Sequence, residues 1–197
     1  MKLSLSTAPD GAVEIIRAAL ADLHGSKLCP LALRALQPDQ FSIGVPHLVY
    51  QLDLGKDGTL APDQLRCDGA RFLIKAGGKL VAVAHVTTGK DGKYAGELSA
   101  ISFGPRAASF ADAIALAEKL PGDIDMEIAL LNVAPLHLHG LLLLPIKGPS
   151  QPLVVALDAA DGATLQAPVS LQDYCTALAP AAAAFVAAAA QSPDALA

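Results

Sequence analysis

Two histidines, His137 and His139, have the type and spacing that come closest to a metal-binding pattern in this chain. In a β-strand, residues i and i+2 project from the same face, so the two imidazoles would stand side by side. Paired imidazoles are suited to Zn²⁺ or Fe²⁺. His85, or else His47, is the candidate for a further ligand from another strand. The pattern predicts a candidate metal site on His137, His139 and His85.

Glu127 is the nearest upstream carboxylate that a strand could carry to this pair. If residues 124–144 form one strand, Glu127 lies about 33 Å from His137, at about 3.3 Å per residue. If Val133-Ala134 is instead a two-residue turn, Glu127 pairs with Gly140 and faces away from His139. Both alternatives exclude Glu127 as a ligand. We therefore favour partly exposed or hydrogen-bonded histidines over a metal site.

A second pattern resembles a calcium-binding loop. Asp53 and Asp57 occupy its first and fifth positions, and Gly58 its sixth. Gly55 and Gln64 stand at the third and twelfth positions, where such a loop carries carboxylates. Because two ligands are missing, the segment is expected to be an ordinary loop.

The motifs of common enzyme classes are absent from the sequence. It contains no G-x-G-x-x-G, G-x-S-x-G, S-x-x-K or H-E-x-x-H. Gly77-Gly78-Lys79 lacks the glycine spacing and the following Ser or Thr of a P-loop. We therefore expect no cofactor and identify no catalytic residue, and whether the protein is an enzyme stays open.

The three cysteines, Cys29, Cys67 and Cys175, lie far apart and form no C-x-x-C pair. This usage favours free, mostly buried thiols in a reducing compartment. The first seven residues lack the apolar run of a signal peptide, and no apolar stretch approaches the roughly 20 residues of a membrane span. These features predict a cytoplasmic protein without a membrane partner.

Composition and charge further limit the classes of partner that we expect. The 197 residues carry a net charge of −5, with lysines and arginines scattered, 4% aromatic residues and no Trp. Nucleic acid is not an expected partner, because neither a basic stripe nor a stacking platform can form. Hydrophobic residues make up 53% of the chain. This excess predicts a thick core and is compatible with a homodimer formed through an apolar surface.

Helical periodicity marks both ends of the chain. Thr7-x-x-Asp10 is typical of a capping box before apolar residues at helical spacing, and His24-Gly25 ends that helix. A short helix is expected over 30–38 and another over 105–120. Ser170-x-x-Asp173 predicts the cap of a final helix, kinked or restarted at Pro180.

Strand patterns fill the middle of the chain. The segments 47–54, 71–76, 79–86 and 94–103 read as strands, and Gly77-Gly78 is the two-residue loop of a tight hairpin. Further strands are expected within 124–144 and over 152–158. Successive strands without intervening helices predict an antiparallel meander rather than a parallel sheet.

The sequence thus predicts an α+β fold: a mostly antiparallel sheet of five to seven strands, with helices at the N-terminus, between strands and at the C-terminus. Residues 1–190 are expected to form a single domain and 191–197 a short tail. No internal repeat stands out.

The leading hypothesis for function is a non-catalytic cytoplasmic binding or protein-interaction module. Its partner would be a second copy, another protein or a small apolar ligand. The alternative is a small enzyme or ligand-binding protein whose site is built from scattered residues, with metal on His137 and His139.

Overall fold

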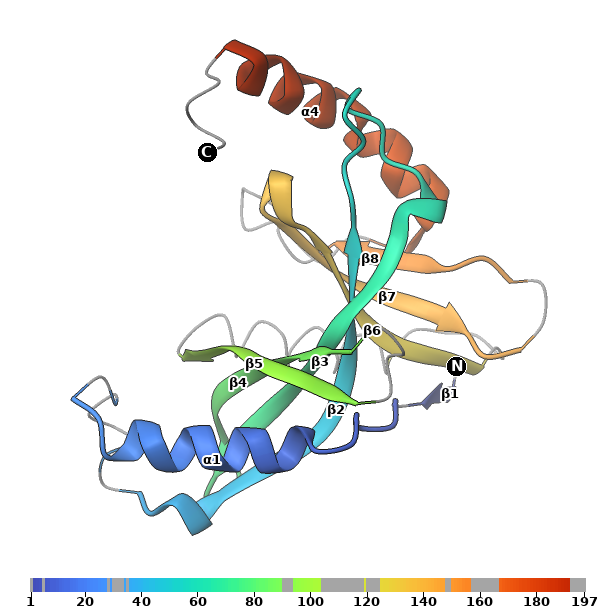
Figure 1. Ribbon diagram of the computed structural model, residues 1–197. Coiled ribbons are helices and arrows are strands. Elements are labelled where there is room, and N and C mark those ends of the chain that lie inside the picture. Colours follow the sequence, from blue (N-terminus) through green and yellow to red (C-terminus); the bar gives the residue numbers. More distant parts are fainter. Residues whose placement is uncertain are drawn as a thin grey trace. The chain divides into compact units, whose positions relative to one another are not determined.

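A tight hairpin joins strands β3 (Leu65–Ala76) and β4 (Lys79–Thr88) at Gly77 and Gly78, as the sequence predicts. Both glycines have positive φ, 54° and 78°, a region open to a residue without Cβ. The hairpin is seen in a computed structural model of the chain (Figure 1). The structure describes residues 2–4, 6–27, 29, 34, 36–89, 94–103, 119, 125–147, 150–156 and 167–191.

The chain divides into two compact units. Unit 1 comprises Met1–Ser4, Val49–Cys67 and Leu116–Ala197, and unit 2 comprises Leu5–Leu48 and Asp68–Ala115. Strand β2 (Phe41–Leu52) and strand β3 each contribute residues to both units.

Unit 2 is an antiparallel sheet in the order β5-β4-β3-β2, with β5 spanning Ala95–Phe103. Arg71 of β3 lies opposite His85 of β4, and His85 lies opposite Ala100 of β5. The register between β4 and β5 shifts on both sides of Val86. Such bulges bend and twist an edge strand, which discourages pairing with another chain.

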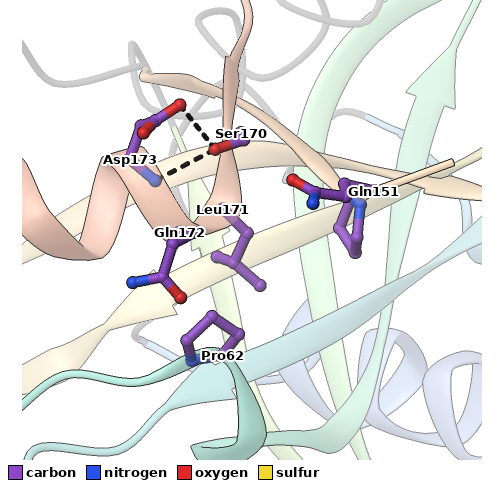
Figure 2. Close-up of a pocket in the computed structure, with 7 residues that line it drawn as sticks. Pro62, Gln151, Ser170, Leu171, Gln172 and Asp173 are labelled. Carbon is purple, nitrogen blue, oxygen red and sulfur yellow. Dashed lines mark hydrogen bonds between the residues drawn. The ribbon is translucent and has the colours of Figure 1, made fainter.

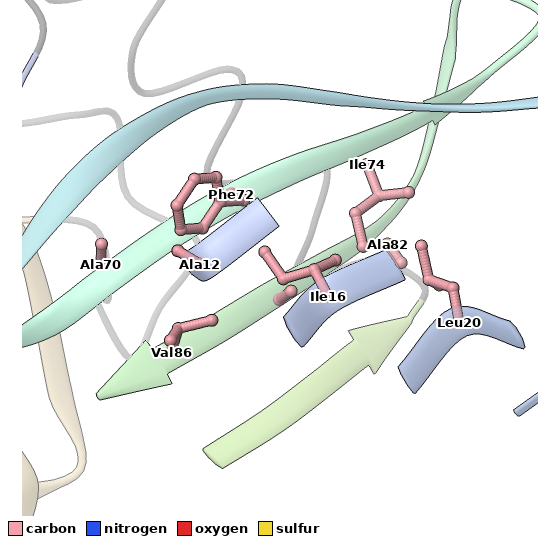
Figure 3. Packing of buried hydrophobic residues seen from close by; sticks show 9 residues of the cluster. Ala12, Ile16, Leu20, Ala70, Phe72, Ile74, Ala82 and Val86 are labelled. Atoms are coloured by element: carbon pink, nitrogen blue, oxygen red, sulfur yellow. The ribbon is translucent and has the colours of Figure 1, made fainter. Parts of the chain in front are cut away.

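Helix α1 (Ala12–His24) covers one face of this sheet (Figure 3). Its buried residues, Ala12, Ile16 and Leu20, recur every fourth position and therefore share one side of the helix. They pack against Phe72, Ile74 and further apolar side chains of β3 and β4. Phe72 and Ile74 are completely buried, so this contact forms the core of unit 2.

Unit 1 is built around the hairpin of β6 (Asp125–Val133) and β7 (Leu138–Pro145). The turn η3 (Ala134–Leu136) joins the two strands. On one side, β7 pairs antiparallel with β8 (Leu153–Ala156), which pairs with the short β9 (Val169–Ser170). On the other side, β1 (Lys2–Ser4) runs parallel to β6.

Helix α4 (Leu171–Gln191) follows β9 directly. The hydroxyl of Ser170 accepts a 3.0 Å hydrogen bond from the backbone N–H of Asp173 and donates a 2.6 Å bond to the Asp173 carboxylate. This is the predicted N-terminal cap. The helix continues through Pro180, so the predicted restart there is wrong, while the alternative of a kink at Pro180 stays a prediction.

Two short turns with the same sequence pattern precede the two longest strands. Leu36-Gln-Pro-Asp-Gln40 leads into β2 and Leu60-Ala-Pro-Asp-Gln64 into β3. In each turn the final glutamine accepts, through Oε1, a hydrogen bond from the backbone N–H three residues earlier, at 2.8 Å and 3.0 Å. Each glutamine side chain therefore caps the turn that leads into one of these strands.

The α+β fold with a mostly antiparallel sheet is confirmed. The described residues contain nine strands rather than five to seven, because β1 and β9 are too short to show a periodicity. Strands β2 and β3 begin about six residues earlier than predicted, at Phe41 and Leu65. The helix expected over 105–120 and most of that over 30–38 lie outside the described residues, and the single-domain expectation stays a prediction.

Candidate functional site

The predicted histidine pair does not lie on one strand. His137 follows the turn η3, is exposed and has a left-handed backbone with φ 53°. His139 lies in β7, opposite Asn132 of β6. The prediction that the two imidazoles stand side by side on one strand is therefore wrong, because His137 belongs to the turn that precedes β7.

Glu127 lies opposite Leu144 in the β6–β7 register rather than opposite Gly140. Residues directly opposite share a face, so Glu127 and His139 project from different faces of the hairpin, as the sequence argument expected. Within the described part of the chain, no group of three His, Cys, Asp or Glu side chains could hold a metal ion.

His85, the third candidate ligand, belongs to unit 2. Its Nε2 atom is buried without a hydrogen-bond partner and lies 3.9 Å from Oδ2 of Asp68. A Cβ at Gly69 would lie only 2.8 Å from the same nitrogen, so the imidazole occupies space that glycine leaves open. Burial, and secondly the charge of Arg71, lower the pKa of His85, while Asp68 acts in the opposite direction. His85 is thus a neutral, tightly packed imidazole at neutral pH.

The calcium-like loop satisfies its own carboxylates. Oδ1 of Asp57 accepts hydrogen bonds from the hydroxyl of Thr59, at 2.7 Å, and from its backbone N–H, at 3.1 Å. These bonds lower the pKa of Asp57. Asp53 pairs with Arg66 at 2.7 Å. Asp53 and Asp57 therefore already have partners within the protein, which favours the interpretation as an ordinary loop.

A pocket lies at the start of α4 in unit 1 (Figure 2). Its volume is about 460 Å³. Leu171 is buried at its centre, and Figure 2 shows the side chains of Gln151 and Gln172 on either side of Leu171. The complete lining is Pro62, Gln151, Pro152, Ser170, Leu171, Gln172 and Asp173.

Two polar side chains of this lining belong to the cap of α4. The hydroxyl of Ser170 and the carboxylate of Asp173 bond to each other in the cap of α4. The backbone N–H of Leu171 donates to the carbonyl of Pro152 at 2.9 Å. The rest of the lining is apolar apart from the carboxamides of Gln151 and Gln172, which can donate and accept hydrogen bonds.

The outer surface of α4 is a second candidate. After Asp173 the helix carries no charged side chain as far as Gln191. Only Leu171, Tyr174, Cys175 and Ala182 of this helix are buried. Among the described residues, this helix is long and apolar enough to cross a membrane, by length and composition only, which corrects the expectation that no apolar stretch approaches that length. A soluble helix of this kind normally packs against another element.

Loop 53–60 accounts for one contact of α4. A Cβ at Gly58 would lie 3.3 Å from the Cα of Ala183, so the loop and the helix backbone approach closely at small residues. Figure 1 shows this segment running alongside α4. The exposed residues of the helix include Ala177, Ala181, Ala184 and Ala188.

Sequence reasoning identified Ser170 and Asp173 only as a helix cap. The other pocket residues come from the segments around Pro62 and Gln151, and proline and glutamine in loops carry no functional signal of their own. No family model matches the chain, and no curated protein or solved structure gives a significant match.

Proposed function

We propose that this chain is a non-catalytic cytoplasmic binding module that associates with a second copy of itself through the outer surface of α4. The observation that carries the proposal is that α4 is largely exposed and carries no charged side chain after Asp173. Such a surface in water favours association, because contact removes apolar area from solvent.

A second copy is the partner that the composition of α4 favours. Two copies of the segment Tyr174–Gln191 bring no like charges together in either orientation. Alanine side chains also allow two helices to approach closely and gain dispersion contacts. Lipid is a weaker partner, since an alanine methyl group offers little apolar area for transfer into hydrocarbon.

The cytoplasmic location is supported by the cysteines. Within the described part of the chain, Cys29, Cys67 and Cys175 form no disulfide, and Cys67 is exposed. Free thiols persist in a reducing compartment.

The test is the oligomeric state of the untagged protein, measured by sedimentation over a range of micromolar concentrations. We expect a monomer–dimer equilibrium that Ala184→Glu shifts strongly towards monomer. Ala18→Glu, on the exposed side of α1, is the matched control and should leave the equilibrium unchanged. A monomer at every concentration, or equal effects of both variants, would contradict the proposal. Co-sedimentation of a monomer with phosphatidylcholine vesicles would replace it with a membrane contact.

The alternative function is a small enzyme or ligand-binding protein. Its metal version, on His137 and His139, stays a prediction and is tested by native mass spectrometry without added metal. A stoichiometric adduct that disappears in His137→Ala would support it. The ligand-binding version rests on the pocket at the start of α4.

A further inference from the structure

The pocket at the start of α4 combines an apolar floor with a polar rim. Leu171 is 3% exposed, and the half-buried Pro62 and Pro152 complete the apolar lining. Gln151 and Gln172 are exposed. A volume of about 460 Å³ is in the range of pockets that bind small ligands or a few residues of peptide.

The charge of the lining limits the ligand. Asp173 is the charged residue among the seven, and no lysine, arginine or histidine lines the pocket. At the N-terminus of α4, the N–H groups of Leu171 and Asp173 already donate to Pro152 and Ser170, which leaves fewer donors for an anion. A phosphate or carboxylate would meet a negative charge and no cation.

The two carboxamides supply the recognition chemistry. Each offers a carbonyl acceptor and an NH₂ donor, the same pair of groups that a peptide unit carries. Within the described part of the chain, no hydrogen bond involves the side chain of Gln151 or Gln172. Both are therefore able to bind a ligand without giving up an internal bond.

We propose that this pocket binds a short extended segment of a partner protein, uncharged or basic at the point of contact. An apolar side chain of the segment packs against Pro62 and Pro152, next to the buried Leu171. The carboxamides of Gln151 and Gln172 hydrogen-bond the neighbouring peptide groups, and the carboxylate of Asp173 favours a nearby cation. This goes beyond self-association, because it concerns a different surface and a different partner.

The experiment is an NMR titration with three leucine derivatives, followed on the side-chain NH₂ signals of Gln151 and Gln172. N-acetyl-leucine amide is neutral, leucine amide is cationic and N-acetyl-leucine carries a carboxylate. We expect saturable shifts with the first two compounds at millimolar concentration. Affinity for the carboxylate should be at least about fivefold weaker, the ratio that corresponds to ~1 kcal/mol.

Variants separate this site from a general surface effect. Gln172→Ala should weaken binding of N-acetyl-leucine amide about fivefold, as expected for the loss of one net hydrogen bond. Gln191→Ala removes the same residue type from the exposed far end of α4 and should leave binding unchanged. Ala184→Glu, which is designed to dissociate the dimer, should also leave it unchanged.

The outcomes are decisive. The proposal is overturned if no compound shifts the Gln151 and Gln172 signals, if all three bind equally, or if Gln191→Ala weakens binding as much as Gln172→Ala. A chain that is monomeric yet binds the neutral amide at this pocket would refute self-association and leave the peptide site standing.

Discussion

The buried imidazole of His47 makes the stability of the fold depend on pH. His47 lies in β2, is 2% exposed, and burial lowers its pKa from 6.5 to about 4. In the unfolded chain the same group takes up a proton near its ordinary pKa. Between these two values the unfolded state binds more protons, so stability falls as the pH falls.

The size of the effect follows from the shift. Full stability is present above pH 6.5, about 2 kcal/mol is lost at pH 5, and about 3 kcal/mol is lost below pH 4, at 1.36 kcal/mol per pKa unit. His47→Gln keeps a polar side chain of similar size but does not titrate. The difference between the two proteins therefore isolates this group, since every other acid and base is common to both.

Urea denaturation of wild type and His47→Gln at a series of pH values provides the measurement. We expect the difference in unfolding free energy to change by about 2 kcal/mol between pH 7.5 and pH 5. An NMR titration of the His47 ring in wild type gives a second readout, with a neutral ring down to about pH 4. A constant difference across this range, or a ring that titrates near pH 6.5, would refute the reasoning.

Two further substitutions and one thiol modification test the packing of the folded protein. Gly69→Ala should destabilise the folded protein by about 2 kcal/mol in urea denaturation, because the new Cβ meets the carbonyl oxygen of Val86. Gly25→Ala is the control and should change the stability little, because a Cβ there comes no closer than 3.7 Å to another atom. Ser170→Ala removes the cap of α4 and should cost about 1 kcal/mol in the same assay, whereas the exposed Ser99→Ala should be neutral. Ellman's reagent should modify Cys67 rapidly in the folded protein and the buried Cys29 and Cys175 only on unfolding. Rapid modification of all three thiols would contradict the burial.

Local signals in the sequence were sufficient for several elements. The Gly77-Gly78 hairpin, the apolar spacing of α1 and the Ser170-x-x-Asp173 cap each depend on residues within a few positions of one another. Even so, α1 begins at Ala12 after Gly11, which has φ 84°, and not at the predicted Thr7 box. The turn at Gly11 precedes the helix without a side-chain cap, and the capping-box pattern does not predict such a start.

Elements that depend on distant partners were missed or misplaced. Strand β1 exists through its parallel pairing with β6, more than 120 residues away. The early parts of β2 and β3 follow turns in which a glutamine side chain caps the backbone, and glutamine is not a residue that usually indicates a turn. His137 was assigned to a strand because a single residue with positive φ leaves no trace in the hydrophobic pattern.

The excess apolar residues of the sequence can lie in the core or on the surface, and only the burial of each residue distinguishes the two. An alanine tract after a good cap is equally compatible with a core helix and with a surface helix, because alanine fits both environments. In the structure, the buried positions of α4 end at Ala182, while alanines on either side of it are exposed. Part of the excess therefore lies on the surface and not in the core. An uncharged surface helix of this length is a reason to expect association, which the sedimentation experiment with Ala184→Glu and Ala18→Glu decides.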